Sequence, residues 1–245
     1  MARTSTPRAR KPARAQAFTR KLLAWWARAA RDLPWRRTRD PYRVLVSEFM
    51  LQQTQVSRVA EYYPRFLERF PDLETLARAR PRAVREAWDG LGYYARASNL
   101  HGLARVVSRD HGGRLPDTPD ELIKLPGVGP YTAGAVATFA YEKPVPAVDT
   151  NVSRVLRRAF WGTNHPPRTT HRGLWNLAAA LVPKNGKRAW KFNQAIMELG
   201  ALVCVARKPR CPECPVRTQC KTGRRLAVSL MPRRLPSVSG IIERG

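Results

Sequence analysis

The chain contains 245 residues and carries a formal net charge of +27 at pH 7. This length allows one large or two small domains, and the charge favours a polyanionic partner, because neutralising phosphates releases their condensed counterions. The longest apolar run near the N-terminus, Leu22–Ala27, is too short for a secretory signal or a membrane span. We therefore expect a soluble cytoplasmic protein that acts on the nucleoid.

Two basic segments flank the rest of the chain. Residues 1–15 contain five basic residues and no acidic one, so we expect a disordered arm that either tethers the protein to DNA or is simply solvated. Residues 221–245 combine basic pairs with prolines, and their pattern predicts no fold.

Between these segments, apolar residues recur at helical spacing. Residues 18–29, 45–56, 152–160 and 192–203 each place large apolar side chains on one helical face. Proline and glycine interrupt the pattern elsewhere, and no alternating run indicates a strand. The sequence therefore predicts an all-α fold.

One carboxylate lies inside an apolar stretch. Glu48 stands in the segment VLVSEFML. A carboxyl group buried among such neighbours has a raised pKa, which suits a general acid. The alternative is an exposed position on an amphipathic helix, and the local sequence does not decide between the two.

Four polar or aromatic residues are candidates for insertion into a DNA duplex. Gln52 and Gln53 are unusually polar for their helix, and Tyr93 and Tyr94 follow a glycine turn. A planar side chain can fill the gap that remains when a base leaves the stack. For the tyrosines, a core position is the alternative that the local sequence favours.

The segment LPGVGPYTAGA at 125–135 predicts a helical hairpin. Gly127, Gly129 and the neighbouring prolines do not continue a helix comfortably, so the chain turns there before a helix of small residues begins at Tyr131. Glycine leaves backbone N–H groups accessible, and these suit phosphate oxygens. In a strongly basic chain this combination indicates DNA binding.

Asp149 directly precedes another apolar helical pattern, so its simplest role is that of a helix N-cap. The positive end of a helix also keeps a carboxylate ionised. An ionised carboxylate can stabilise a cationic sugar during glycosidic cleavage. The capping role and the catalytic role are compatible.

All four cysteines lie in one short stretch, with the spacing C-x6-C-x2-C-x5-C. As thiolates, Cys204, Cys211, Cys214 and Cys220 could bind zinc or an iron–sulfur cluster. Zinc sites more often use two close pairs, whereas this set has one, and together with the rest of the chain this favours a [4Fe-4S] cluster. The basic residues between the cysteines suit phosphates or balance the thiolate charge.

These features resemble the endonuclease III-like helix-hairpin-helix superfamily of DNA glycosylases and, within it, the adenine DNA glycosylase family. The resemblance implies two helical domains with the DNA and the active site between them. One is a six-helix hairpin domain over residues 37–147, and the other joins residues 16–36 to 148–220 and holds the cluster. The matching stretches are LPWR at 33–36, DPYRVLVSEFMLQQTQV at 40–56, GLGYYARASNLH at 90–101, LPGVGPYTAGA at 125–135, VDTNVSRVL at 148–156, FNQAIMELGALVC at 192–204 and the cysteine set.

The resemblance also implies roles for the site residues. Glu48 would protonate N7 of adenine, and Asp149 would stabilise the oxocarbenium-like sugar, directly or through a transient covalent adduct. Tyr131 would line the site, and Asn151 would help to place the catalytic carboxylate or water. The residues that would surround the flipped adenine are Arg31, Arg36 and Gln194, and those that would intrude into the duplex are Gln52 and Tyr93.

Tyr131 distinguishes between branches of the superfamily. Bifunctional members carry a lysine there, which forms a Schiff base and then cuts the strand. We therefore expect a monofunctional, monomeric glycosylase that removes adenine paired with guanine or 8-oxoguanine in double-stranded DNA. The alternatives are a thymine or uracil mismatch glycosylase, against which Glu48 argues, and a cluster-bearing DNA-binding protein without catalytic activity.

Two features depart from the family pattern. Thr150 stands where the family usually has glycine, and we expect little effect from it. Adenine glycosylases commonly carry a C-terminal domain that reads 8-oxoguanine, and we expect the residues after Cys220 to hold no such domain. We therefore expect weaker discrimination of 8-oxoguanine from guanine, or discrimination by Tyr93 and the hairpin domain alone.

Overall fold

The structure of the protein, a computed structural model, describes residues 13–162 and 171–229, and these residues contain no strand. The predicted all-α fold is confirmed. None of the helices in these ranges is long and apolar enough to cross a membrane. The α-helices are α1 (Ala13–Ala29), α2 (Pro41–Leu51), α3 (Val56–Arg69), α4 (Leu73–Arg78), α5 (Pro81–Ala87), α6 (Ala95–Asp110), α7 (Pro119–Leu122), α8 (Pro130–Phe139), α9 (Thr150–Leu156), α10 (His171–Leu181), α11 (Gly186–Leu202) and α12 (Lys221–Ser229). Shorter elements are the 3-10 helices η1 (Pro34–Arg36), η3 (Cys211–Glu213) and η4 (Arg217–Gln219) and the π-helix η2 (Arg157–Trp161).

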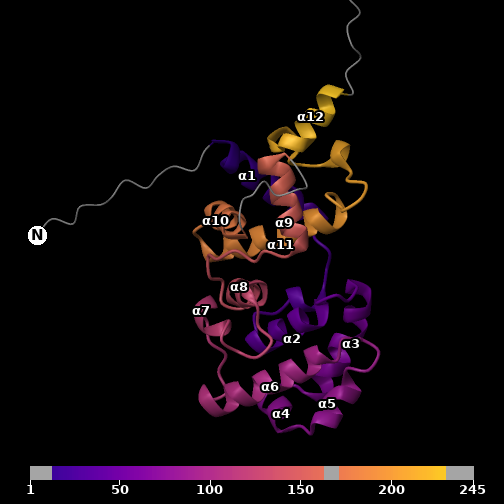
Figure 1. Ribbon diagram of the computed structural model, residues 1–245, viewed down its shortest axis with the longest axis vertical. Coiled ribbons are helices and arrows are strands. Elements are labelled where there is room, and N and C mark those ends of the chain that lie inside the picture. The colour runs from indigo at the N-terminus through magenta and orange to yellow at the C-terminus, as the bar shows by residue number, and fades with distance from the viewer. Residues whose placement is uncertain (1–12, 163–170, 230–245) are drawn as a thin grey trace, which may run out of the picture.

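The helices form two lobes, one above the other in Figure 1. Helices α2 to α8 build the lower lobe, while α1 and α9 to α12 build the upper one. Helix α8 lies at the boundary and contacts both α2 and α11. The chain therefore crosses the boundary twice, once after α1 and once before α9.

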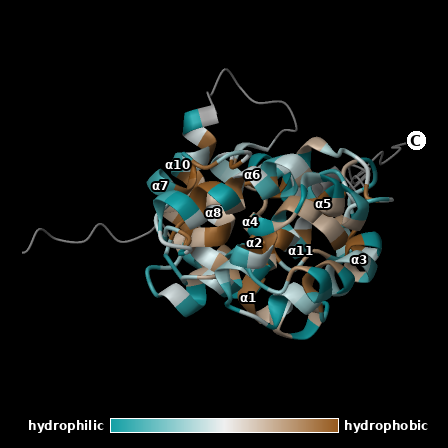
Figure 2. Cartoon of the chain, turned by 90° about the horizontal axis from the view of Figure 1, so that it is seen from below, coloured by the Kyte–Doolittle hydropathy of each residue, from teal (hydrophilic) through white to brown (hydrophobic). Residues whose placement is uncertain are grey.

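Two clusters of buried apolar side chains correspond to the two lobes. Leu45 and Trp88 belong to the lower cluster, and Phe18 and Ile196 belong to the upper one. Figure 2 shows hydrophobic residues gathered on α8 and around the centre, with hydrophilic residues on many outer turns. The expected segment 16–36 is divided between the lobes, because Leu33 and Trp35 are buried in the lower cluster.

The linker that leads from α8 to α9 is held closely against both neighbouring helices. A Cβ atom on Gly134 of α8 would lie 2.3 Å from the carbonyl oxygen of Pro146, so only glycine fits there. From α11, the amide oxygen of Asn193 accepts a 3.0 Å hydrogen bond from the Ala147 N–H, and its nitrogen donates to the Val145 carbonyl. These contacts fix the segment that delivers Asp149 to the boundary between the lobes.

The described ends of the chain differ from the sequence prediction. Helix α1 begins at Ala13, inside the expected disordered arm 1–15, because Arg14 donates to the carbonyls of Gln219 and Ala159. No fold was predicted after Lys221, yet α12 packs against η2, where the Thr222 hydroxyl donates to a backbone carbonyl at 3.0 Å. The predictions for residues 1–12 and 230–245 fall outside the described residues.

Candidate active site

A cleft of about 900 Å³ contains most of the polar residues that the sequence singled out. Its lining includes residues of α2, α8, α9 and α11, so both lobes contribute to it. The predicted residues that it brings together are Arg31, Arg36, Glu48, Gln52, Gln53, Tyr131, Asp149, Asn151 and Gln194. Tyr93, Gly127, Gly129 and the four cysteines do not line this cleft.

Glu48 lines the cleft and is only 4% exposed, so the exposed alternative is wrong. Helix α2, which carries it, begins at Pro41 behind an Asp40 side chain that caps the Arg43 N–H at 2.8 Å. Burial raises the pKa of Glu48 to about 7, with a further contribution from the charge of Asp149. A carboxyl with this pKa is protonated in a large fraction of molecules near neutral pH.

Tyr131 lies in the first turn of α8 and donates a 2.7 Å hydrogen bond to Oε2 of Glu48. This bond opposes the effect of burial on the pKa of Glu48. Burial raises the pKa of the Tyr131 phenol well above its ordinary value of 10, and the negative charge of Glu48 adds to this. Tyr131 is therefore a neutral hydrogen-bond donor at this position.

Asp149 is the N-cap of α9, as the sequence predicted. Its Oδ1 accepts a 2.6 Å hydrogen bond from the Val152 N–H, and its Oδ2 accepts one of 3.1 Å from the amide of Asn151. The sequence predicted that the helix terminus keeps this carboxylate ionised. Burial raises the pKa of Asp149 from its ordinary value, and the hydrogen bonds from Val152 and Asn151 partly oppose this rise.

A hydrogen-bonded chain leads from Asp149 toward the cysteines. Arg154 donates from Nη2 to the side-chain oxygen of Asn151 at 2.6 Å and from Nε to the Cys204 carbonyl at 2.8 Å. Helix α11 comes close at Gly200, where a Cβ atom would lie 2.7 Å from that of Asn151. Sequence analysis missed Arg154, although its position three residues after Asn151 on α9 was a usable signal.

A second buried carboxylate, Glu198 on α11, also lines the cleft and binds two of its arginines. It is 1% exposed and accepts hydrogen bonds from Arg31 at 2.7 Å and from Arg36 at 2.8 Å. Arg36 also donates to Gln194 at 2.8 Å. Burial acts to raise the pKa of Glu198, but the two arginines outweigh it and the pKa is lowered. Sequence analysis missed Glu198, although it lies among apolar residues as Glu48 does.

The candidate wedge residues occupy two loops, one after α2 and one before α6. Gln53 is exposed with φ = 57°, and Tyr93 is 62% exposed with φ = 48°. The core alternative is therefore wrong for Tyr93. Gln52 points toward α8, with its amide 3.5 Å from the Thr132 hydroxyl, and Tyr94 is half-buried with its hydroxyl bonded to Asp89.

The predicted helical hairpin consists of α7, a turn and α8. Gly127 adopts φ = 72°, and a Cβ atom there would lie 2.6 Å from the Cβ of Asn99, so the turn excludes larger residues. Gly129 is the N-cap of α8 and has open space beside it. Gly127 is itself exposed, so its backbone is accessible at the turn.

All four cysteines line one hollow in the upper lobe, together with Arg158 and residues around η3. Arg158 donates to the Cys204 sulfur at 3.4 Å, and the Gly223 N–H donates to the Cys220 sulfur at 3.3 Å. Burial raises the pKa of the Cys214 thiol to about 12, so a metal group that binds here must displace thiol protons. Within the described ranges, no group of three or more His, Cys, Asp or Glu side chains has an arrangement that could hold a single metal ion.

Residues 46–180 match the model of the HhH-GPD superfamily of base excision DNA repair proteins. The chain belongs to this superfamily. It is 49% identical over 196 residues to a protein of Mycolicibacterium smegmatis named adenine DNA glycosylase, and 44% identical over 220 residues to a rat protein of the same name. These alignments cover 80% and 86% of this chain but 66% and 42% of the relatives, so the chain spans less than two thirds of their length.

Two solved structures show the same fold as this chain. A thermostable thymine-DNA glycosylase has a TM-score of 0.80 and 35% identity, over 86% of this chain and 97% of that one. An endonuclease III trapped in a covalent complex with DNA has a TM-score of 0.73 over 86% of this chain and 96% of that one. Its identity is 24%, so this second likeness concerns the fold alone.

Proposed function

We propose that this HhH-GPD protein is a monofunctional adenine DNA glycosylase. Its reaction would be hydrolysis of the N-glycosidic bond of adenine paired with guanine or 8-oxoguanine in duplex DNA. The observation that carries the proposal is Glu48, a buried carboxyl whose pKa lies at about 7 and which shares a cleft with Asp149. The names of the mycobacterial and rat relatives support the same substrate.

The two carboxyl groups would have different roles in the reaction, one as an acid and one as a stabilising anion. Glu48 in its protonated form donates to N7 of adenine, which makes the base a better leaving group. As the bond breaks, the sugar acquires oxocarbenium character, and ionised Asp149 stabilises it directly or through a transient covalent adduct. Water then adds to C1′ and loses a proton, which leaves an abasic sugar and free adenine. Asn151 orients Asp149 through the bond between their side chains, and Tyr131 orients Glu48.

DNA recognition would use the surfaces around the cleft. The Gly127 and Gly129 turn offers backbone N–H groups to a phosphate, and Gln52, Gln53 and Tyr93 fill the duplex where the adenine leaves it. Three cleft residues would contact the flipped base, namely Arg31, Arg36 and Gln194.

We further propose that Cys204, Cys211, Cys214 and Cys220 hold a [4Fe-4S] cluster. Their common hollow supports this, because a cluster keeps its own sulfides between the ligands and spaces the thiolates more widely than a single ion does. When bound, the cluster would cross-link the loop between Cys204 and Cys220. Base hydrolysis needs no electron transfer, so its role would be structural.

Incubation with defined duplexes tests the proposed substrate. Pairs of adenine with guanine and with 8-oxoguanine should yield alkali-labile sites, whereas T:G and U:G pairs should not. Glu48→Gln and Asp149→Asn should each abolish excision, and Glu68→Gln, an exposed carboxylate on α3, should leave it unchanged. Excision from T:G in place of the adenine pairs would overturn the proposed substrate.

Borohydride trapping tests the monofunctional mechanism. Because Tyr131 supplies no amine, the wild-type protein should form no stoichiometric covalent adduct with DNA in borohydride and should leave an uncut abasic site. A robust strand cut with a trapped adduct would contradict this mechanism while leaving the substrate question to the duplex experiment.

A further inference from the structure

Arg96, near the start of α6, is a buried cation whose hydrogen-bond acceptors are all neutral. The residue is 6% exposed, and its guanidinium lies against the rings of Trp88 and Tyr93. Burial lowers the pKa of Arg96 from its ordinary value, yet a guanidinium remains charged in proteins. An arginine held in this way requires compensation from the dipoles of the surrounding backbone.

Its two terminal nitrogen atoms join two loops that are about forty residues apart in the sequence. Nη1 donates to the carbonyls of Met50 and Gln52 at 2.7 and 2.5 Å, at the end of α2. Nη2 donates to the carbonyls of Leu91 and Gly92 at 3.1 and 2.9 Å. One planar group therefore fixes the distance between residues 52–55 and residues 90–93.

The hydrogen bonds of Arg96 include the peptide groups next to the two residues with left-handed backbone conformations. Gln53 and Tyr93 have positive φ angles, which non-glycine residues adopt only when their surroundings impose them. The Gln52 carbonyl belongs to the peptide that leads into Gln53, and the Gly92 carbonyl belongs to the peptide that leads into Tyr93. Arg96 therefore fixes the peptide group that precedes each of the two left-handed residues, Gln53 and Tyr93.

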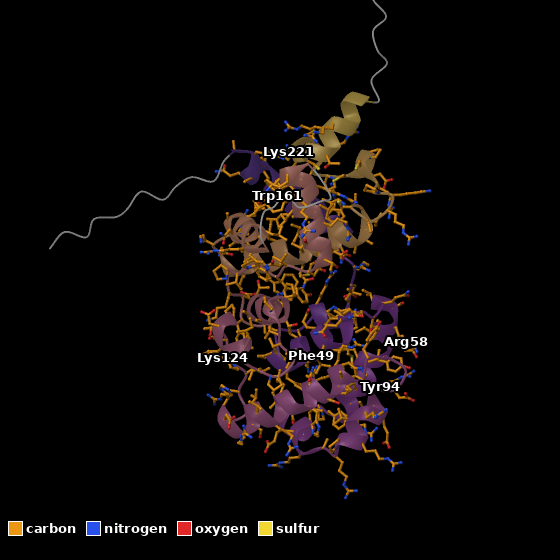
Figure 3. The ribbon with its side chains drawn as sticks, viewed as in Figure 1. Phe49, Arg58, Tyr94, Lys124, Trp161 and Lys221 are labelled. Carbon is orange, nitrogen blue, oxygen red and sulfur yellow. The ribbon has the colours of Figure 1, made fainter. Side chains whose placement is uncertain are left out.

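Residues of both loops line a second hollow of about 650 Å³, among them Gln53 and Leu91, together with Arg58. Figure 3 shows Arg58 and Tyr94 along one edge of the lower lobe, with Phe49 further inside. The Phe49 carbonyl also accepts from Arg96, at 3.0 Å. Arg96 thus connects the interior of the lobe to the edge where the 52–55 and 90–93 loops lie. We call Arg96 and these hydrogen bonds the clamp.

We propose that Arg96 is a positioning residue that sets the 52–55 and 90–93 loops together, so that Gln53 and Tyr93 enter the duplex in register when the base leaves it. This inference rests on the proposed function. It assigns Arg96 no contact with the base or the sugar. Lysine cannot replace it, because a single ammonium group cannot span both sets of carbonyls.

The test begins with Arg96→Lys, and Arg105→Lys on the exposed side of α6 is the matched control. On an adenine:8-oxoguanine duplex, the single-turnover rate constant of Arg96→Lys should fall about 10- to 100-fold, as expected for misplaced recognition groups, and that of the control should not change. Hydrogen exchange should show lost protection confined to the two loops. An unchanged rate constant would overturn the proposal.

A double-mutant cycle separates positioning from general stability. If Arg96 acts through the loops, Arg96→Lys should lower excision less than about twofold in a Tyr93→Ala background. An equal fall in both backgrounds would make Arg96 a structural residue only and overturn the proposal. So would loss of the fold in both Arg96→Lys and Arg96→Gln, as judged by thermal unfolding.

If the wild-type protein excised no base, the proposed function would be wrong. The role of Arg96 would then be tested by hydrogen exchange in the presence of DNA. In that case DNA should protect the 52–55 and 90–93 loops in the wild type and not in Arg96→Lys. Equal protection in the two proteins would overturn the inference.

Discussion

The phenol of Tyr131 donates a 2.7 Å hydrogen bond to the Glu48 carboxyl, across 83 residues of sequence. Burial raises the pKa of Glu48, while this bond favours the ionised form and lowers it. The balance leaves the pKa at about 7, where the carboxyl can both give up a proton to a base and regain it from water.

Excision should decline as the pH rises through about 7, because the reaction requires protonated Glu48. Single-turnover rate constants measured from pH 5.5 to 9 should fall about tenfold per pH unit on the alkaline side. A rate that stays flat to pH 9 would show that Glu48 does not act as the acid.

Tyr131→Phe should move this alkaline limb to higher pH. The substitution removes the hydrogen bond that lowers the pKa of Glu48, and burial then acts with less opposition. The same pH series measures the shift, whose direction matters more than its size. A shift to lower pH would mean that the phenol does not stabilise the ionised carboxylate.

Glu48→Gln should stabilise the protein at alkaline pH. The folded-state pKa of Glu48, about 7, exceeds the ordinary value of 4.5, so protonation of this carboxyl favours the folded state. That contribution to the free energy of unfolding is complete below pH 4.5 and is lost as the pH rises through 7. Glutamine has no charge to bury, so the variant should gain about 3 kcal/mol over the wild type at pH 8 and less at pH 5. Urea unfolding at both pH values measures the difference. An equal gain at pH 5 and pH 8 would exclude ionisation as its cause.

Glu198→Gln should destabilise the protein and reduce excision. The substitution leaves Arg31 and Arg36 without their carboxylate partner, and breaking a buried ion pair costs about 3 kcal/mol. The matched control is Asp32→Asn, because the Asp32–Arg37 pair is exposed on both sides, and such pairs contribute less than about 1 kcal/mol. Comparable losses in the two variants would contradict the assigned role of Glu198.

Cys214→Ser should lower the iron content and the absorbance near 400 nm, because the other three cysteines would hold the proposed cluster less firmly. Iron and zinc are measured together in the protein as purified. If the wild-type protein contained zinc and no iron, the four cysteines would form a zinc site and the proposed cluster would be wrong.

Local patterns in the sequence were sufficient to predict several features of the fold. The hairpin glycines, the Asp149 N-cap and the helical periodicity depend on residues only a few positions apart, and helices obey such short-range rules. The cysteine spacing likewise predicted a candidate ligand set, although it did not decide between metals.

Only the tertiary structure decided the electrostatics of the site. The pKa of Glu48 depends on burial under α8 and on Asp149, both remote in sequence, and no local pattern determines that burial. Glu198 and Arg96 were missed for the same reason, because their partners come from other segments of the chain. The sequence by itself determined the helices and the candidate residues. Long-range packing decided which groups are buried, which charges they meet and which loops they hold.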